Sequence, residues 1–468
     1  MAQTSTLSAD WAIRTVPADV WRYTFVICYR NPFRATSGVV RLGHVCRTWR
    51  AIVHGAPELW TNVSIKVIES SEGPHITPKP ELLPIILSNS GSMPLKMSLT
   101  TFWYSDEKLD DFIDVAKRFF QATRRAKYLN LYFFSTKVLT LHGAEKEIRT
   151  CDILQDLRIG FQGDGMEIIP LISELWSSAP FLRSFRLTEG FSKPINLDLI
   201  AALETSSFPF HQLTVLAVES RISVKALFRI LPSTPSLISA TLTHIVGEMD
   251  EGPSKDLTLQ ALESLTMEGL GEESPPLTPL LRYFISPSLT TLSLGCDRGW
   301  SLDSFKTFVV KSSPRIEHLD LGIMDSSDDD KIDCLRLLPS LRTLALILDK
   351  HIIEQDKSMF LGEQFCLDMQ QWDTSADAFA VCPNLEKLTI NYQALRDKTG
   401  TIFANMVERR WRKSPASRDF EVHISDVYHR PKDKKLSELI RLLVMKQSGL
   451  NLTVSEPQDW LDGLLGSQ

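Results

Sequence analysis

The sequence predicts an α/β fold: N-terminal helices followed by an irregular repeat solenoid, with a curved parallel sheet and helices outside it. Two observations predict this arrangement. An apolar-x-x-apolar-x-apolar pattern recurs nine times between residues 154 and 390, and helical stretches separate several of its copies. Residues 16–65 instead carry two amphipathic helical stripes, which indicate a separate module.

The composition is typical of a soluble globular chain of 468 residues, with 43% hydrophobic and 23% charged residues. This length allows two or three domains. A net charge of −6 argues against a nucleic-acid partner. Seven cysteines without CxxC spacing favour reduced thiols in a cytoplasmic or nuclear protein. The sequence shows no signal region and no apolar run of membrane length, so we expect no membrane partner.

The N-terminal module begins with a helix that Pro17 and Asp19 favour, because both suit a first helical turn. A second helix is expected over residues 42–53, where apolar side chains form a broad one-sided stripe. Short helices of this kind cannot bury both stripes against each other. One stripe therefore needs another partner.

Three motifs mark this module: VPADV at 16–20, followed by Thr24-Phe25; LGHVCRTW at 42–49; and PELW at 57–60. Together they resemble an F-box, the helical module through which adaptor subunits bind Skp-type proteins of cullin–RING ubiquitin ligases. The overall spacing is similar to versions common in mushroom-type fungi. Val16, Asp19, Trp21 and Thr24 depart from the residues most usual in the family.

The resemblance implies a non-enzymatic substrate-recognition subunit, which binds a Skp-type adaptor and, through it, a cullin–RING ligase. The residues expected to contact the adaptor are Val16, Pro17, Val20, Trp21, Leu42, Val45 and Cys46. Trp49, Ile52 and Trp60 are expected to pin the module to itself and to the first strand. The alternative is an ordinary helical cap on a larger domain.

The repeats resemble leucine-rich repeats over roughly residues 90–425. Their central residues are Leu157, Phe185, Leu216, Ala240, Leu265, Leu292, Leu319, Leu344 and Leu388. Most steps between these residues fall in or near the range for leucine-rich repeats. A helical solenoid of the HEAT type is the rival, and the short β-rich segments disfavour it. The longest step holds either an insertion or a repeat whose strand has degenerated near residues 365–367.

These patterns predict five segments. A flexible N-terminus at 1–13 precedes the F-box at 14–62, and a linker with the first strand and helix follows at 63–89. The repeat solenoid occupies 90–425, with an insertion near 350–378. Residues 426–468 are expected to form a C-terminal cap over the exposed core.

Period-2 alternation places the repeat leucines inside and the intervening residues on one shared sheet face. We expect this face to bind the protein that is recognised. The residues predicted to contact it are Arg158, Arg186, Thr241, Thr266, Ser293, His318 and Asp320. The alternatives are a solvated face without a tight partner, or docking through the loops.

The remaining motifs favour structural roles. Residues 160–165 lack the order of a phosphate-binding loop and favour a turn, and the acidic run at 325–330 favours a solvated loop, with Ser326 and Ser327 as candidate phosphorylation sites. The basic run at 409–413 favours a helix C-terminus. No metal-ligand spacing or hydrolase motif occurs, so we expect no cofactor, no metal site and no enzymatic activity.

Two other functions stay open at this point. The chain could be a solenoid interaction scaffold whose N-terminal module no longer engages an adaptor. It could also be an enzyme, which would require a deep pocket with convergent titratable groups.

Overall fold

The chain forms two compact units, which comprise residues 1–213 (unit 1) and 214–468 (unit 2). Each unit is described by itself. The computed structural model describes residues 16–29, 37–70, 73–102, 110–133, 151–162, 173–177, 179–189, 203, 207–247, 253, 255–269, 274–295, 297, 299–322, 326–347, 361–391, 402–413, 420–425 and 433–454.

Unit 1 opens with three short helices, α2 (Ala18–Tyr29), α3 (Ser37–Val45) and α4 (Arg47–His54), and a 3-10 turn, η1 (Pro57–Trp60). The prediction of one helix over residues 42–53 is wrong at Cys46. This residue is extended, with φ −157° and ψ 171°, and its Sγ accepts a hydrogen bond from the Trp49 N–H at 3.4 Å. Because a capping side chain starts a new helix, the stripe is divided between α3 and α4.

Aromatic rings form the core of these helices. Trp49 lies against Trp21 and Phe25, with ring centroids 4.9 and 4.8 Å away. Trp60 is buried and donates its indole N–H to the Val53 carbonyl at 2.8 Å. Trp49 and Trp60 thus pack inside the module, as the sequence predicts.

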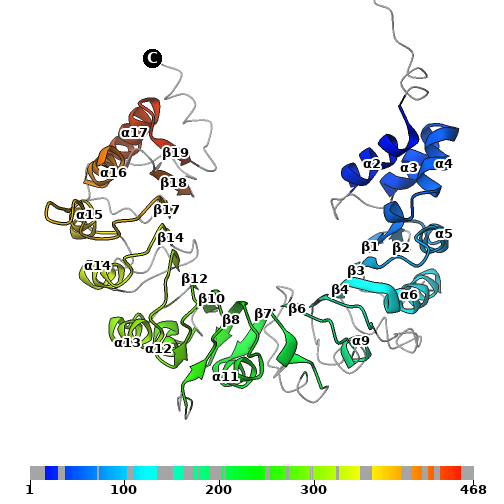
Figure 1. The fold of residues 1–468 in the computed structure, drawn as a ribbon, viewed down its shortest axis with the longest axis horizontal. Coiled ribbons are helices and arrows are strands. Elements are labelled where there is room, and N and C mark those ends of the chain that lie inside the picture. The colour runs from blue at the N-terminus through cyan, green and yellow to red at the C-terminus, as the bar shows by residue number, and fades with distance from the viewer. Residues whose placement is uncertain are drawn as a thin grey trace, which may run out of the picture. The chain divides into compact units, whose positions relative to one another are not determined.

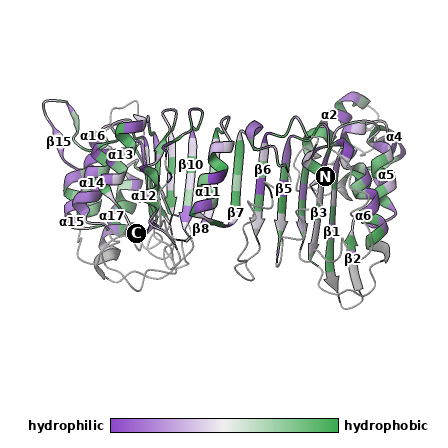
Figure 2. Ribbon diagram, turned by 90° about the horizontal axis from the view of Figure 1, so that it is seen from below, coloured by the Kyte–Doolittle hydropathy of each residue, from purple (hydrophilic) through white to green (hydrophobic). Residues whose placement is uncertain are grey.

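The sheet of unit 1 has the strand order β2-β1-β3-β4-β5-β6, parallel except for β2. Its helices α5, α6 and α9 cover one face and leave the other open (Figure 1). The strands are β1 (Asn62–Ser70), β2 (Gly73–Thr77), β3 (Leu95–Phe102), β4 (Ala126–Phe133), β5 (Asp156–Phe161) and β6 (Ser184–Glu189). The helices are α5 (Leu82–Asn89), α6 (Asp110–Ala122) and α9 (Glu174–Ser177). In Figure 2, α5 and α6 carry both hydrophobic and hydrophilic residues, as amphipathic helices of an outer layer do.

Unit 2 repeats this arrangement with the order β7-β8-β10-β12-β13-β14-β17-β18-β19. The strands are β7 (Val215–Ser223), β8 (Ser239–Val246), β10 (Ser264–Gly269), β12 (Thr291–Gly295), β13 (His318–Gly322), β14 (Thr343–Ile347), β17 (Lys387–Asn391), β18 (Glu421–Ser425) and β19 (Asn451–Val454). The helices are α11 (Val224–Ile230), α12 (Leu277–Leu281), α13 (Leu302–Ser312), α14 (Asp328–Arg336), α15 (Glu363–Met369), α16 (Ile402–Lys413) and α17 (Asp433–Gln447). Two small sheets pair β9 (Leu257–Thr258) with β11 (Phe284–Ile285), and β15 (Trp372–Asp373) with β16 (Ala378–Phe379).

Strand register confirms the predicted repeat core. In unit 1, Leu157 pairs with Phe185, and in unit 2 the seven predicted central residues from Leu216 to Leu388 lie opposite one another in one buried row. The chain is therefore an α/β, leucine-rich-repeat-like solenoid. The helical alternative is wrong, because parallel ladders of strands join the repeats.

The sheet extends beyond residues 90–425. At the start of unit 1, β1 pairs with β3 and α5 follows, so the strand and helix predicted within 63–89 belong to the solenoid. At the end of unit 2, β19 pairs with β18 and α17 packs against β19. Residues 433–454 thus form a last helix–strand unit at the end of the sheet, within the segment 426–468 predicted as a C-terminal cap.

The segment near 350–378 behaves as an insertion between two paired strands. β14 pairs directly with β17, and residues 365–367 lie in the helix α15, which contacts α14 and α16. The degenerate-strand alternative is therefore wrong for these residues. Residues 350–360 lie outside the described part of the chain.

Three weaker motifs receive structural roles. Gly160 and Phe161 belong to β5 rather than to a turn, and residues 163–165 lie outside the described residues. The acidic run starts α14 instead of forming a solvated loop: the Ser327 Oγ accepts the Asp330 N–H, and Ser326 is buried. The basic run ends α16 at Lys413, as predicted.

A buried carboxyl in unit 2 should make stability depend on pH. Glu438 of α17 accepts the N–H groups of Phe403 and Ala404, at 3.3 and 2.8 Å, and burial raises its pKa to about 7. Because this pKa lies above the ordinary value of 4.5, folding favours the protonated form. The contribution to stability is full below about pH 4.5 and is lost as the pH rises through about 7.

We therefore expect the free energy of unfolding of the wild-type chain to fall by about 1–3 kcal/mol more than that of Glu438→Gln between pH 5 and pH 8. Urea denaturation at both pH values measures this difference. The exposed Glu363→Gln is the matched control and should follow the wild-type profile. Parallel profiles for wild type and Glu438→Gln would contradict the assignment.

Candidate functional site

The N-terminal helices leave large apolar side chains in solvent. Val20, Tyr23 and Ile27 lie on one side of α2 at a spacing of three and four residues, and are 50, 69 and 48% exposed. Val45, at the end of α3, is 56% exposed. We call these four residues the N-terminal apolar surface. Exposed apolar side chains on a small module indicate a protein interaction site.

The residues predicted to contact the adaptor occupy different environments. Pro17, Val20 and Val45 are exposed, whereas Val16, Leu42 and Cys46 are half-buried. Trp21 is also half-buried, and its ring packs on Phe25 and Trp49 beneath the surface. The adaptor-binding role of these residues stays a prediction.

The predicted substrate-binding residues lie on the open sheet faces. In unit 1, Arg158 of β5 pairs with Arg186 of β6. In unit 2, one row crosses four strands and contains Thr241, Thr266, Ser293 and Asp320. His318 lies on the same strand as Asp320 and is exposed. Burial raises the pKa of Asp320, which accepts a hydrogen bond from the Ser293 hydroxyl at 3.4 Å.

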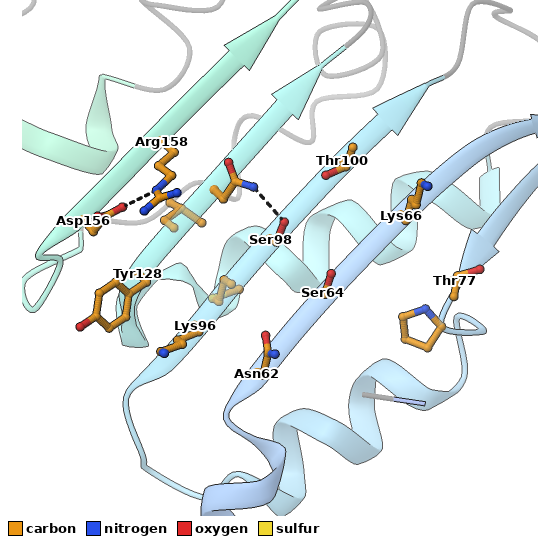
Figure 3. Close-up of a pocket in the computed structure, with 14 residues that line it drawn as sticks. Asn62, Ser64, Lys66, Thr77, Lys96, Ser98, Thr100, Tyr128, Asp156 and Arg158 are labelled. Carbon is orange, nitrogen blue, oxygen red and sulfur yellow. Dashed lines mark hydrogen bonds and ion pairs between the residues drawn. The ribbon is translucent and has the colours of Figure 1, made fainter. Parts of the chain in front are cut away.

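A hollow of about 700 Å³ lies on the open face of unit 1, over β1 to β5 (Figure 3). Polar and aromatic side chains from these strands line it. They include Asn62, Ser64, Lys66, Thr77, Lys96, Ser98, Thr100, Tyr128, Asn130, Asp156 and Arg158. The hollow lies on the sheet surface, so a chain segment can lie across several strands.

Three hydrogen bonds order the floor and one wall of the hollow. The Asn130 amide donates to the Ser98 hydroxyl at 3.3 Å, which fixes the centre of the floor. Arg158 Nε donates to an Asp156 oxygen at 3.1 Å (Figure 3). The Ser184 hydroxyl donates to the other Asp156 oxygen at 3.0 Å. Asp156 is therefore engaged within the face and adds little free negative charge.

Sequence reasoning missed most of this hollow. The apolar alternation of β1, β3 and β4 predicts their buried side chains, but the predicted binding face starts only at β5 with Arg158. The outward residues between them include Lys66, Lys96 and Tyr128. The same period-2 alternation, applied to the outward residues of these strands, would have found them.

The described part of the chain offers no cluster of three or more His, Cys, Asp or Glu side chains able to hold a metal ion. Burial raises the pKa of Cys151 and of Cys382 to about 12, so these two thiols are protonated near neutral pH. Within the described residues, no helix combines the length and apolar character needed to cross a bilayer.

No family model matches the sequence, and no curated protein matches it. The solved structures that are similar to it include the following two. A protein from Bacteroides fragilis is 12% identical, with 66% of this chain and 67% of that chain covered and a TM-score of 0.30. The leucine-rich repeat-containing protein LegL7 from Legionella pneumophila is 14% identical, with 77 and 96% covered and a TM-score of 0.31.

Proposed function

We propose that this chain is the substrate-recognition subunit of a Skp–cullin–F-box ubiquitin ligase. Its N-terminal helices bind a Skp-type adaptor, and the open faces of its sheets bind the protein to be ubiquitinated. The chain itself performs no chemistry. It raises the local concentration of the bound protein beside a ligase assembled on the adaptor, in the cytoplasm or the nucleus.

The observation that carries this proposal is the N-terminal apolar surface. The rings of Trp21, Phe25 and Trp49 already supply the core of the helices, yet Val20 and Val45 remain about half exposed. Apolar side chains left over after a core is complete stabilise association with another protein. The motifs at 16–20, 42–49 and 57–60, which resemble an F-box, support a Skp-type adaptor as the binding partner.

Co-purification tests the proposal directly. The full chain, co-expressed with a Skp-type adaptor, is expected to elute with it as a one-to-one complex in size-exclusion chromatography. The variant Pro17→Ala/Leu42→Ala should elute without the adaptor, because it truncates two apolar contacts predicted at the interface. A circular dichroism melt of this variant distinguishes loss of binding from loss of folding.

Failure of the folded wild-type chain to retain any Skp-type adaptor would overturn the ligase proposal. The chain would then be an interaction scaffold that acts through its sheet faces. Ubiquitin transfer by the assembled ligase to a protein captured on the chain gives a second readout, which a scaffold does not produce.

A further inference from the structure

We propose that the hollow on the open face of unit 1 binds an acidic protein segment in extended conformation. This inference rests on the proposed function and deepens it, because it names the chemistry of the protein segment that the ligase subunit recognises. It starts from the charges that line the hollow and from the spacing between them.

The face is basic in a chain that is acidic overall. The charged residues on the described open face of β1 to β6 are Lys66, Lys96, Arg158, Arg186 and one acid, Asp156, which forms an ion pair with Arg158 at 3.1 Å. The Lys127 ammonium adds a further positive charge, 5.7 Å from the centroid of the Tyr128 ring that lines the hollow. The whole chain carries a net charge of −6. A local excess of positive charge on such a chain attracts anionic partners and orients them.

The two lysines of the hollow are available to a ligand. Lys66 Nζ lies 5.4 Å from the centroid of the Phe102 ring, and Lys96 Nζ lies 5.1 Å from that of Tyr128. Among the described residues, no carboxylate forms a salt bridge with either ammonium group. Aromatic rings thus hold both cations at the rim without neutralising them.

The open face of unit 2 lacks this excess of positive charge. Its Lys387 forms an ion pair with Glu421 at 2.9 Å, and Asp320 lies in the central row. An anionic segment is therefore expected on unit 1 rather than on unit 2.

The spacing of the cations matches an extended chain. Lys96 lies opposite Asn62, and Lys66 lies opposite Thr100, so the two lysines are four positions apart along the strands, or about 13 Å. Arg158 lies two strands beyond β3, about 10 Å across the sheet. Carboxylates four residues apart lie on the same side of an extended segment and are also about 13 Å apart. One segment can therefore reach two cations at once.

The floor between these cations admits a peptide backbone. Ser64 and Ser98 are neighbours in register, and Asn130 lies beside Ser98. Their short side chains allow close approach, and their hydroxyl and amide groups can exchange hydrogen bonds with peptide groups.

Single-stranded nucleic acid is the other polyanion that a basic face with tyrosines could bind. The geometry disfavours it, because the rings are engaged. Tyr132 packs on Phe102 with ring centroids 5.6 Å apart, and two ammonium groups, those of Lys96 and Lys127, lie over Tyr128 at 5.1 and 5.7 Å. Bases would have to displace these contacts in order to stack.

The test uses the full chain and a fluorescein-labelled 12-residue Gly/Ser peptide with Asp at every fourth position. Fluorescence polarisation should show saturable binding that weakens as the salt concentration rises. The same peptide with Asn in place of Asp should bind at least about tenfold more weakly. Equal binding of the Asp and Asn peptides, or no saturable binding of the Asp peptide, would overturn the proposal.

Variants locate the binding to the hollow. Lys66→Glu/Lys96→Glu should weaken binding of the Asp peptide at least about tenfold, and Lys66→Arg/Lys96→Arg should restore it to within about threefold of wild type. Lys225→Glu/Lys255→Glu makes the same charge change at exposed positions in unit 2 and should bind like wild type. If Lys66→Glu/Lys96→Glu and Lys225→Glu/Lys255→Glu weaken binding of the Asp peptide equally, the assignment to the hollow is overturned.

Two further measurements separate the possible failures. A fluorescein-labelled 12-nucleotide uridine RNA that binds more tightly than the Asp peptide and displaces it would overturn the peptide assignment in favour of nucleic acid. The Val20→Asp/Val45→Asp variant should bind the Asp peptide like wild type, because its substitutions lie on α2 and α3. If the chain binds an adaptor but not the Asp peptide, only this inference is contradicted. If it binds the Asp peptide but no adaptor, only the ligase proposal is contradicted.

Discussion

Replacing Val20 and Val45 by aspartate should weaken capture of a Skp-type adaptor by at least about 100-fold. Both side chains are about half exposed on the isolated chain, so the substitutions cost little in folding. In a complex each valine would become buried, and burial of such a side chain contributes about 1.5–3 kcal/mol. An aspartate at the same position would also have to lose its hydration.

Isothermal titration calorimetry with a purified adaptor measures this effect, and a thermal melt shows whether the variant is folded. The control is Val310→Asp/Val444→Asp, which alters two exposed valines on α13 and α17, at 76 and 51% exposure. This control should bind the adaptor like wild type. Equal affinity of both variants would mean that the N-terminal apolar surface is not the adaptor site.

Replacing Arg410 by methionine should lower the free energy of unfolding by about 3–5 kcal/mol. The Arg410 side chain is buried in unit 2 and donates to three backbone carbonyls, those of Met369, Val381 and Cys382, at 2.8, 2.6 and 3.2 Å. Its guanidinium also lies 4.4 Å from the centroid of the Phe379 ring. Burial lowers its pKa to about 10, so the group remains charged at neutral pH.

This arginine binds α16 to the inserted segment near β15 and β16. Methionine fills a similar volume but leaves the three carbonyls without their donor, which is the costly part of the change. Arg412→Met on the same helix is the matched control. Arg412 forms a surface ion pair with Glu408 at 2.6 Å, and its loss should cost at most about 1 kcal/mol. Urea denaturation compares the two variants, and similar losses would contradict this role of Arg410.

The buried half of the sheet could be predicted because its signal is local. Leucines two residues apart with a polar residue between them place one side chain inside and the next outside. Leu292 and Leu294 are buried with Ser293 between them, and Leu319 and Leu321 are buried with Asp320 between them. The α/β solenoid and the residues on its open sheet face therefore followed from the residues alone.

The N-terminal helices show where a local pattern is insufficient. The stripe from Leu42 to Val53 satisfies helical spacing throughout, but the backbone is extended at Cys46 and a second helix begins there. Likewise, the spacing of Val20, Tyr23 and Ile27 predicts a helix face without saying whether it is covered. Only the packing of Trp21, Phe25 and Trp49 decides which side of α2 remains in solvent.

The sequence by itself determined the repeating unit and the residues that alternate along each strand. The tertiary structure alone decided which strands are neighbours: that β1 pairs with β3, and that β14 pairs with β17 across an insertion. Strand pairing joins residues far apart in the chain, and the alternation of one strand carries no information about its partner. The basic hollow of unit 1 depends on that pairing, because Lys66, Lys96 and Arg158 come from three different strands.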